Sequence, residues 1–163
     1  MTEISFLFVG DIYTETISGQ KPEWKFYMDE VLKLPNVKHL SGLKHRQTPP
    51  FYWQSAVNWM PYKASLPFVK ACCPLKIPDG LASGHQIISA DVPECRLYPE
   101  WVSIYQNADE AVALITSAVE NAETLEARKR RYAQIEFARK NTWTERAKRL
   151  VEILARSSAD TGS

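Results

Sequence analysis

The sequence lacks several features that each identify a class of protein. Its 163 residues include only three cysteines, none in a CxxC pair, so we expect neither a disulfide framework nor a cysteine-built metal site. The three histidines are scattered and form no HExxH motif. No apolar run approaches the roughly 18 residues of a membrane span, and the first residues lack the basic start and apolar stretch of a signal peptide. These absences predict a cytoplasmic protein that carries no metal and no cofactor.

The chain also lacks a clear excess of either charge. Twenty Lys and Arg against 19 Asp and Glu leave a net charge of +1, whereas a dedicated nucleic-acid binder is normally more basic. A hydrophobic fraction of 45% and a charged fraction of 24% are typical of a globular protein, and the length allows one sizeable core. We therefore expect one folded domain with no nucleic-acid partner.

The charge is unevenly distributed. Residues 1–122 carry ten basic and 13 acidic side chains, whereas residues 123–156 carry ten and five. The run Arg128 to Arg131 is expected to be a solvated helix face, because Glu123, Glu126 and Glu136 dilute it. The alternative is attraction to anionic membrane lipid, with peripheral contact at the inner face of the membrane.

Short apolar runs predict strands in the first two thirds of the chain. Ile4 to Val9 is nearly continuous and ends at Gly10, a pattern typical of a parallel strand buried on both faces. A glycine at that end lets the backbone approach a ligand closely. The further expected strands are Trp24 to Met28, Val37 to Leu40, Val57 to Tyr62, Gln86 to Ala90 and Trp101 to Tyr105.

Helix signals dominate the C-terminal third. Asn107 to Glu110 is a capping box that precedes an apolar stripe, and Thr142 to Glu145 is a second one. The second box opens a helix with one apolar face, and a basic helix over Thr124 to Lys140 is expected between the two. A short helix after Thr48 and a frayed tail over residues 157–163 complete the prediction.

Alternating strands and helices predict an α/β fold: a Rossmann-like, three-layer domain over residues 1–156, with a mostly parallel sheet and C-terminal helices. Such sheets bind ligands at the carboxyl ends of their strands. We expect a pocket there, near Gly10, Gly42, Pro61-Tyr62 and Ala90-Asp91.

The segment from Cys72 to Gly84 carries the most chemistry. Pro74 suits the first turn of a helix, whose free amides favour phosphate, and Lys76 adds a full positive charge in the same turn. Asp79, one turn further on, can accept hydrogen bonds from sugar hydroxyls, and Gly84 can end the helix as a left-handed cap. This order of groups is typical of a nucleotide-sugar site.

The run PLKIPDGLASGHQIIS resembles the donor-site signature of GT-B glycosyltransferases, and LPNVKHLSG and ARKNTWTERAKRLVEIL resemble other segments of those families. The segment LKHRQTPPFYWQSAVNWMPYKASLPFVKACCPLKIPDGLASG is similar, without a gap, to the glucuronosyltransferases of xanthan-type exopolysaccharide assembly. The resemblance extends from about Phe6 to Leu154. It covers only the C-terminal, donor-binding domain of a two-domain enzyme.

The resemblance implies a role for eight residues. It places Gly10 and Ile12 at the loop after the first strand, and Leu43 and Tyr62 around the base and ribose. It places Cys73, Leu75 and Lys76 at the diphosphate, with Asp79 where the wider families carry a ribose-binding Glu. Two departures are expected to matter. Pro78 would limit the helix to a short first turn, and the short connection from Gly10 to Asn36 leaves little room for a crossover helix.

The implied function is the donor-binding half of a glycosyltransferase, with a UDP-sugar such as UDP-glucuronate as substrate in bacterial surface polysaccharide synthesis. The catalytic base would lie in an acceptor domain, supplied in trans or by a longer parent protein, so no base is assigned here. One alternative is a non-catalytic, truncated donor domain that binds a nucleotide or a partner. Another is an unrelated flavodoxin-like or response-regulator domain, whose acidic pocket only Asp11 represents.

Overall fold

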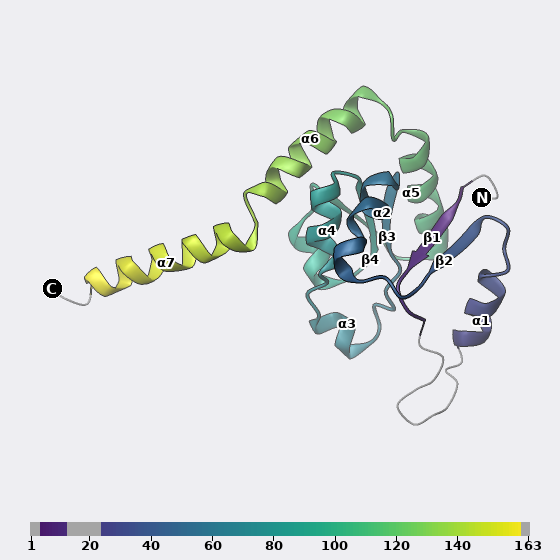
Figure 1. The fold of residues 1–163 in the computed structure, drawn as a ribbon, viewed down its shortest axis with the longest axis horizontal. Helices are drawn as coiled ribbons and strands as arrows, with labels where there is room; N and C mark the ends of the chain where they lie inside the picture. The colour runs from purple at the N-terminus through teal and green to yellow at the C-terminus, as the bar shows by residue number, and fades with distance from the viewer. Residues whose placement is uncertain (1–3, 13–23, 161–163) are drawn as a thin grey trace. The chain divides into compact units, whose positions relative to one another are not determined.

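The computed structural model describes residues 4–12 and 24–160. The chain divides into two compact units, Met1–Gln54 and Ser55–Ser163. Both units are built from parallel strands joined through helices, so the α/β, Rossmann-like class predicted from the sequence is confirmed (Figure 1). The single-domain boundary at residue 156 stays a prediction.

The first unit contains a two-stranded parallel sheet. Strand β1 (Phe6–Val9) pairs with β2 (Val37–Leu40), with Phe6 opposite Val37. Its helices are α1 (Trp24–Val31), the 3₁₀ turn η1 (His45–Gln47) and α2 (Pro49–Gln54), which is the short helix expected after Thr48.

Two predictions for this unit are wrong. Trp24 to Met28 is not a strand but the start of α1, so the connection between β1 and β2 does hold a helix. A five-residue aromatic run fits either element, and periodicity alone does not separate them. Strand β1 is also not buried on both faces: Leu7 is 45% and Val9 38% exposed, while Phe6 and Phe8 are half-buried. The alternation shows a strand with one covered face.

The second unit contains the sheet β3-β4-β5, in which all the strands are parallel. The strands are β3 (Val57–Met60), β4 (Gln86–Ala90) and β5 (Val102–Tyr105), close to their predicted bounds. The other elements of this unit are α3 (Pro67–Ala71), α4 (Lys76–Ser83), the 3₁₀ helix η2 (Pro93–Leu97), α5 (Ala108–Glu120), α6 (Leu125–Arg139) and α7 (Trp143–Asp160).

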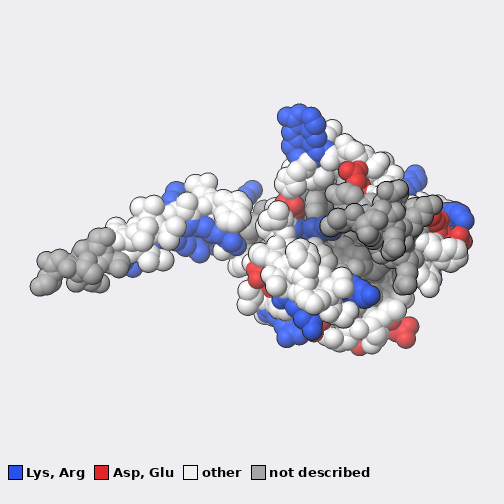
Figure 2. Space-filling view, turned by 90° about the horizontal axis from the view of Figure 1, so that it is seen from below, with Lys and Arg blue, Asp and Glu red and all other residues white. Residues whose placement is uncertain are grey.

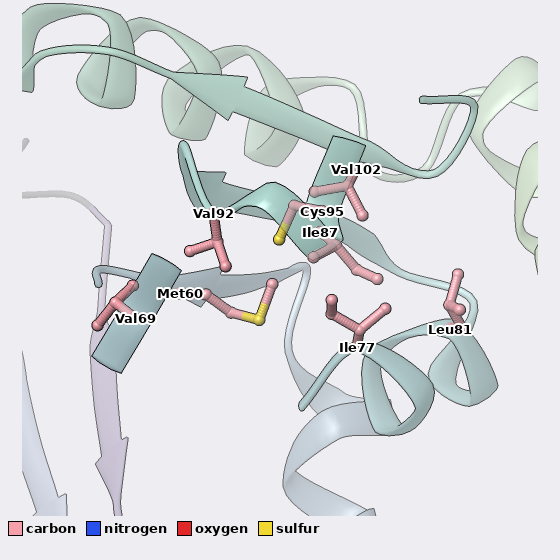
Figure 3. Close-up of a cluster of buried hydrophobic side chains, with 8 residues drawn as sticks. All are labelled: Met60, Val69, Ile77, Leu81, Ile87, Val92, Cys95 and Val102. Atoms are coloured by element: carbon pink, nitrogen blue, oxygen red, sulfur yellow. The ribbon is translucent and has the colours of Figure 1, made fainter. Parts of the chain in front are cut away.

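The central strand β4 is buried on both faces. Ile87 faces α4, because a Cβ built on Gly80 would lie 3.0 Å from its side chain. Ile88, which points to the opposite face, is fully buried as well, and α5 packs against all three strands. Figure 3 shows Ile77 and Leu81 of α4 beside Ile87, within a core cluster that also contains Met60, Val69, Val92, Cys95 and Val102.

Most of the helix ends are where the sequence predicts them. Gly84 follows α4 with φ +74°, the left-handed cap, and Asn107 caps α5 by accepting from the Glu110 N–H at 2.9 Å. Glu110 reaches back to accept from the backbone N–H of Gln106 and from the side-chain amide of Asn107, each at 2.8 Å. Thr124 caps α6 in the same way. Helix α7 continues to Asp160, so part of the expected frayed tail is helical, and residues 161–163 lie outside the described residues.

The basic run on α6 is only partly a solvated face. Arg128 and Lys129 are exposed and pair with Glu123 and Glu126. Arg130 is half-buried, and its guanidinium donates to the side-chain oxygen of Gln86 and to two backbone carbonyls at the start of β5. Arg128 is therefore a solvated residue, whereas Arg130 connects α6 to the sheet.

Candidate functional site

The first turn of α4 lies at the carboxyl edge of the second unit's sheet. Strand β3 ends at Met60, and α4 leads into β4, which runs parallel to β3. Since the chain must return to the amino edge to enter β4, α4 ends at that edge and begins at the opposite one. The structure thus brings Tyr62, two residues after the end of β3, to the same edge as Lys76.

The backbone before α4 offers unbonded amides. Within residues 4–12 and 24–160, the N–H groups of Cys73, Leu75 and Lys76 donate no hydrogen bond, whereas that of Ile77 donates to Pro74 O at 3.1 Å. Unbonded amides at a helix start carry partial positive charge and suit an anion. These are the three residues that the resemblance assigns to the diphosphate.

Pro78 does not shorten the helix, so that expectation is wrong. It is the third residue of α4, which continues through Ser83. A proline in the first turn removes an N–H that would have had no partner within the helix, so the helix loses nothing there. Asp79 follows it, half-buried and three residues after Lys76, which puts both side chains on one face of the helix. Its contact with ribose stays a prediction.

Lys76 and Tyr62 contact each other. The Lys76 ammonium lies 5.4 Å from the centre of the Tyr62 ring, a cation–π arrangement. Tyr62 is half-buried, and burial raises the pKa of its phenol, so the ring stays neutral at ordinary pH. Among the described residues, no carboxylate forms an ion pair with Lys76. The exposed Lys76 ammonium therefore lies beside the Tyr62 ring, where its positive charge is accessible to an anion.

The three cysteines have different surroundings. Cys73 is exposed and its thiol lies 3.6 Å from a Glu94 carboxylate oxygen, Cys72 is half-buried, and Cys95 is fully buried beside Ser89. Burial raises the pKa of the Cys95 thiol. Desolvation and the Glu94 charge raise that of Cys73.

We expect Cys73 to be the first thiol that iodoacetamide modifies in the folded chain. The rate should still be rising above pH 9, because the thiolate is the nucleophile and the pKa of Cys73 is raised. Peptide mass spectrometry after a time course measures this. Cys95 should react only in denaturant; modification of Cys95 as fast as Cys73 would contradict the burial described here.

The remaining predicted residues, Gly10, Ile12 and Leu43, belong to the first unit. Gly10 follows β1 with φ +127°, and its backbone pairs with Leu40 at 2.9 Å. Gly42 follows β2 with φ +69° and donates its N–H to Asp11 at 2.9 Å. Both glycines therefore have a backbone conformation that favours glycine, at the carboxyl edge of their own sheet. The ligand roles of all three residues stay predictions.

Three polar side chains at the edge of the second sheet form a hydrogen-bonded cluster that the sequence does not predict. Asp91, directly after β4, accepts two hydrogen bonds from Arg96, each 2.7 Å long, and one from Gln106 at 3.3 Å. The Arg96 guanidinium lowers the pKa of this carboxyl. The sequence signal was the position of Asp91 at a strand end; the partnership with Arg96 and Gln106 depends on the fold.

Among the described residues, no group of three or more His, Cys, Asp or Glu side chains could hold a metal ion. In the same part of the chain, every helix is too short or too polar to cross a bilayer.

Comparisons with known proteins give a distant similarity. No family model matches the chain. It is 27% identical, over 111 residues, to a Bacillus subtilis (strain 168) protein provisionally described as the teichuronic acid biosynthesis glycosyltransferase TuaH. The match covers 60% of this chain and 28% of that protein, so the chain spans well under half of its relative. The chain is thus similar, over part of its length, to one segment of a protein with that description.

Proposed function

We propose that this chain is the nucleotide-sugar-binding half of a GT-B glycosyltransferase, and that the diphosphate binds at the start of α4. The α4 site comprises Tyr62, Cys73, Leu75, Lys76 and Asp79. The observation that carries the proposal is the group of unbonded amides beside an unneutralised Lys76 at the carboxyl edge of a parallel sheet. The distant glycosyltransferase relative supports the reaction class.

In the proposed reaction, an acceptor hydroxyl attacks the anomeric carbon and the bond from that carbon to the diphosphate oxygen breaks. The proton of the hydroxyl goes to a base outside this chain, and negative charge accumulates on the departing nucleoside diphosphate. In this proposal, Lys76 and the helix-start amides stabilise that charge electrostatically. UDP-glucuronate is the proposed donor.

The acceptor half would come from another chain or a longer protein. The relative supports this view, because the match covers only 28% of its length. The same observation favours a second candidate function, a nucleotide-binding module that transfers no sugar. An acceptor-type Rossmann domain encoded in the neighbouring reading frame would favour the divided enzyme.

Calorimetric titration of the full chain with UDP, UDP-glucose and UDP-glucuronate tests the proposal. We expect the three ligands to bind and Lys76→Ala to weaken each at least tenfold, because a charged hydrogen bond contributes about 1.5–3 kcal/mol. The matched control is Lys70→Ala, an exposed lysine in the last turn of α3, which should leave affinity unchanged. Absence of heat at millimolar nucleotide in the unmodified chain would overturn the proposal.

A further inference from the structure

Glu94 lies beside the α4 site, although the sequence does not predict it there. Its carboxylate oxygen Oε1 is 3.6 Å from the thiol sulfur of Cys73, whose backbone N–H is one of the unbonded amides before α4. Glu94 is half-buried and belongs to η2, which follows β4 at the carboxyl edge of the sheet. The α4 site therefore has a negative group next to its unbonded amides.

The 3₁₀ helix η2 holds the backbone of Glu94 in place. Val92 and Cys95, which flank it, are fully buried, and the Cys95 N–H donates to the Val92 carbonyl at 2.9 Å. The Arg96 guanidinium donates two hydrogen bonds to Asp91, so the segment from 91 to 96 is closed by its own ion pair. A backbone anchored on both sides presents the Glu94 side chain to the α4 site from a fixed position.

No cation forms an ion pair with Glu94 in the part of the chain that the structure describes, and the neighbouring Arg96 is already paired. Helix α7 carries basic side chains, seen on its visible face in Figure 2. One of them, Arg146, opposes the rise in the pKa of the Cys73 thiol that desolvation and Glu94 cause. Its guanidinium lies 5.4 Å from the centre of the Trp143 ring. The Glu94 carboxylate thus has capacity to accept further hydrogen bonds.

The groups of the α4 site follow an order. Tyr62 and Asp79, which the resemblance assigns to the nucleoside, lie on the Lys76 side. Glu94 lies on the Cys73 side. A diphosphate bound along the amides from Lys76 to Cys73 would place its β-phosphate next to Glu94. In a nucleotide sugar, the group attached to that phosphate is the hexose, whose hydroxyls are hydrogen-bond donors.

We propose that Glu94 binds the sugar ring of the donor, by accepting hydrogen bonds from hydroxyl groups of the hexose. This inference rests on the proposed function and adds to it a residue that distinguishes a nucleotide sugar from a nucleotide. A carboxylate suits this role, because hydrogen bonds to an ionised acceptor are stronger than those to a neutral one. UDP lacks the hexose, and the charge of Glu94 repels its phosphates, so Glu94 favours the substrate over the product.

Calorimetric titration of the full chain with UDP-glucose and with UDP, both in EDTA, tests the inference. We expect Glu94→Ala to weaken UDP-glucose binding at least tenfold, whereas UDP binding should stay the same or strengthen. Glu94→Gln keeps an acceptor oxygen without the charge, so its affinity for UDP-glucose should lie between those of the parent chain and Glu94→Ala. The matched control is Glu120→Ala, an exposed acid at the last residue of α5, which should leave both affinities unchanged.

Two outcomes would overturn the inference and leave the proposed function intact: equal weakening of UDP and UDP-glucose binding by Glu94→Ala, or no effect on either ligand. An effect on both ligands that appears only when magnesium replaces EDTA would assign Glu94 to a cation on the diphosphate instead. Failure of both ligands to bind the parent chain would overturn the proposed function and this inference with it. Lys76→Ala should weaken both ligands, so UDP alone distinguishes the two residues.

Discussion

Replacing Gly84 with alanine is expected to destabilise the second unit by about 3 kcal/mol. Gly84 has φ +74°, a conformation that costs an L-residue about 1–2 kcal/mol. A Cβ there would also lie 2.6 Å from Arg131 Cγ and 2.9 Å from the Arg131 carbonyl oxygen. Overlap with backbone is relieved only by moving α6, which adds about 1–3 kcal/mol. Urea unfolding should show a midpoint about 1.5 M lower, for a slope of about 2 kcal/mol per M.

Gly42 provides the control for this substitution. Its φ is +69°, nearly the same as that of Gly84, but a Cβ there would meet nothing within 4 Å. Gly42→Ala should therefore cost only the conformational part, about 1–2 kcal/mol in its own unit. If both substitutions lowered the free energy of unfolding equally, the close approach of Gly84 to α6 would add no steric cost.

Arg130→Ala is expected to cost about 2–3 kcal/mol. Its guanidinium donates to the Gln86 side chain and to the carbonyls of Glu100 and Trp101, which connects α6 to the entrances of β4 and β5. Removing the guanidinium leaves partly buried acceptors without their donor. This lowers the free energy of unfolding, because the acceptors have lost their contact with water and gain no new partner. Arg130→Lys should restore little, because an ammonium cannot reproduce the planar fork. Chemical unfolding followed by circular dichroism measures both variants.

Arg128→Ala is the matched control on the same helix. Arg128 is exposed and pairs with an exposed Glu123 at 3.1 Å. Exposed ion pairs contribute little, so the free energy of unfolding should change by no more than about 0.5 kcal/mol. If Arg128→Ala and Arg130→Ala were equally mild, Arg130 would be a solvated residue like its neighbour, as the charge pattern alone suggested.

The sequence predicts the parts of this fold that depend on local chemistry. Gly84, Asn107 and Thr124 are end signals that act within one turn of their own helix, and all three are found at those ends. The strands β4 and β5 are short apolar runs, and their observed ends lie within one residue of the predicted ends.

The errors concern features that depend on tertiary context. Trp24 to Met28 is rich in residues that favour strands, yet it forms α1, because short apolar runs do not determine their own element. Gln134 gave no signal at all: it is fully buried on α6 and donates to the carbonyls of Gly80 and His85. Only the packing of α6 against α4 gives a polar residue that role.

The candidate site likewise has features that local sequence predicts and features that depend on tertiary structure. The α4 segment could be predicted because Cys73, Leu75 and Lys76 are neighbours in sequence and their amides are free for local reasons. The contact of Lys76 with Tyr62 joins residues 14 positions apart, and it follows only from the parallel pairing of β3 with β4. Gly10, Ile12 and Leu43 lie in the other unit, beyond the reach of any local argument.

Amide chemical-shift mapping can detect a nucleoside diphosphate at the start of α4, where we propose that it binds. The chain has a mass of 18.6 kDa, which suits two-dimensional NMR of a ¹⁵N-labelled sample titrated with UDP. We expect the largest shifts on the amides of Cys73, Leu75 and Lys76, with a smaller one at Tyr62. Shifts confined to other elements, or none at millimolar UDP, would contradict it.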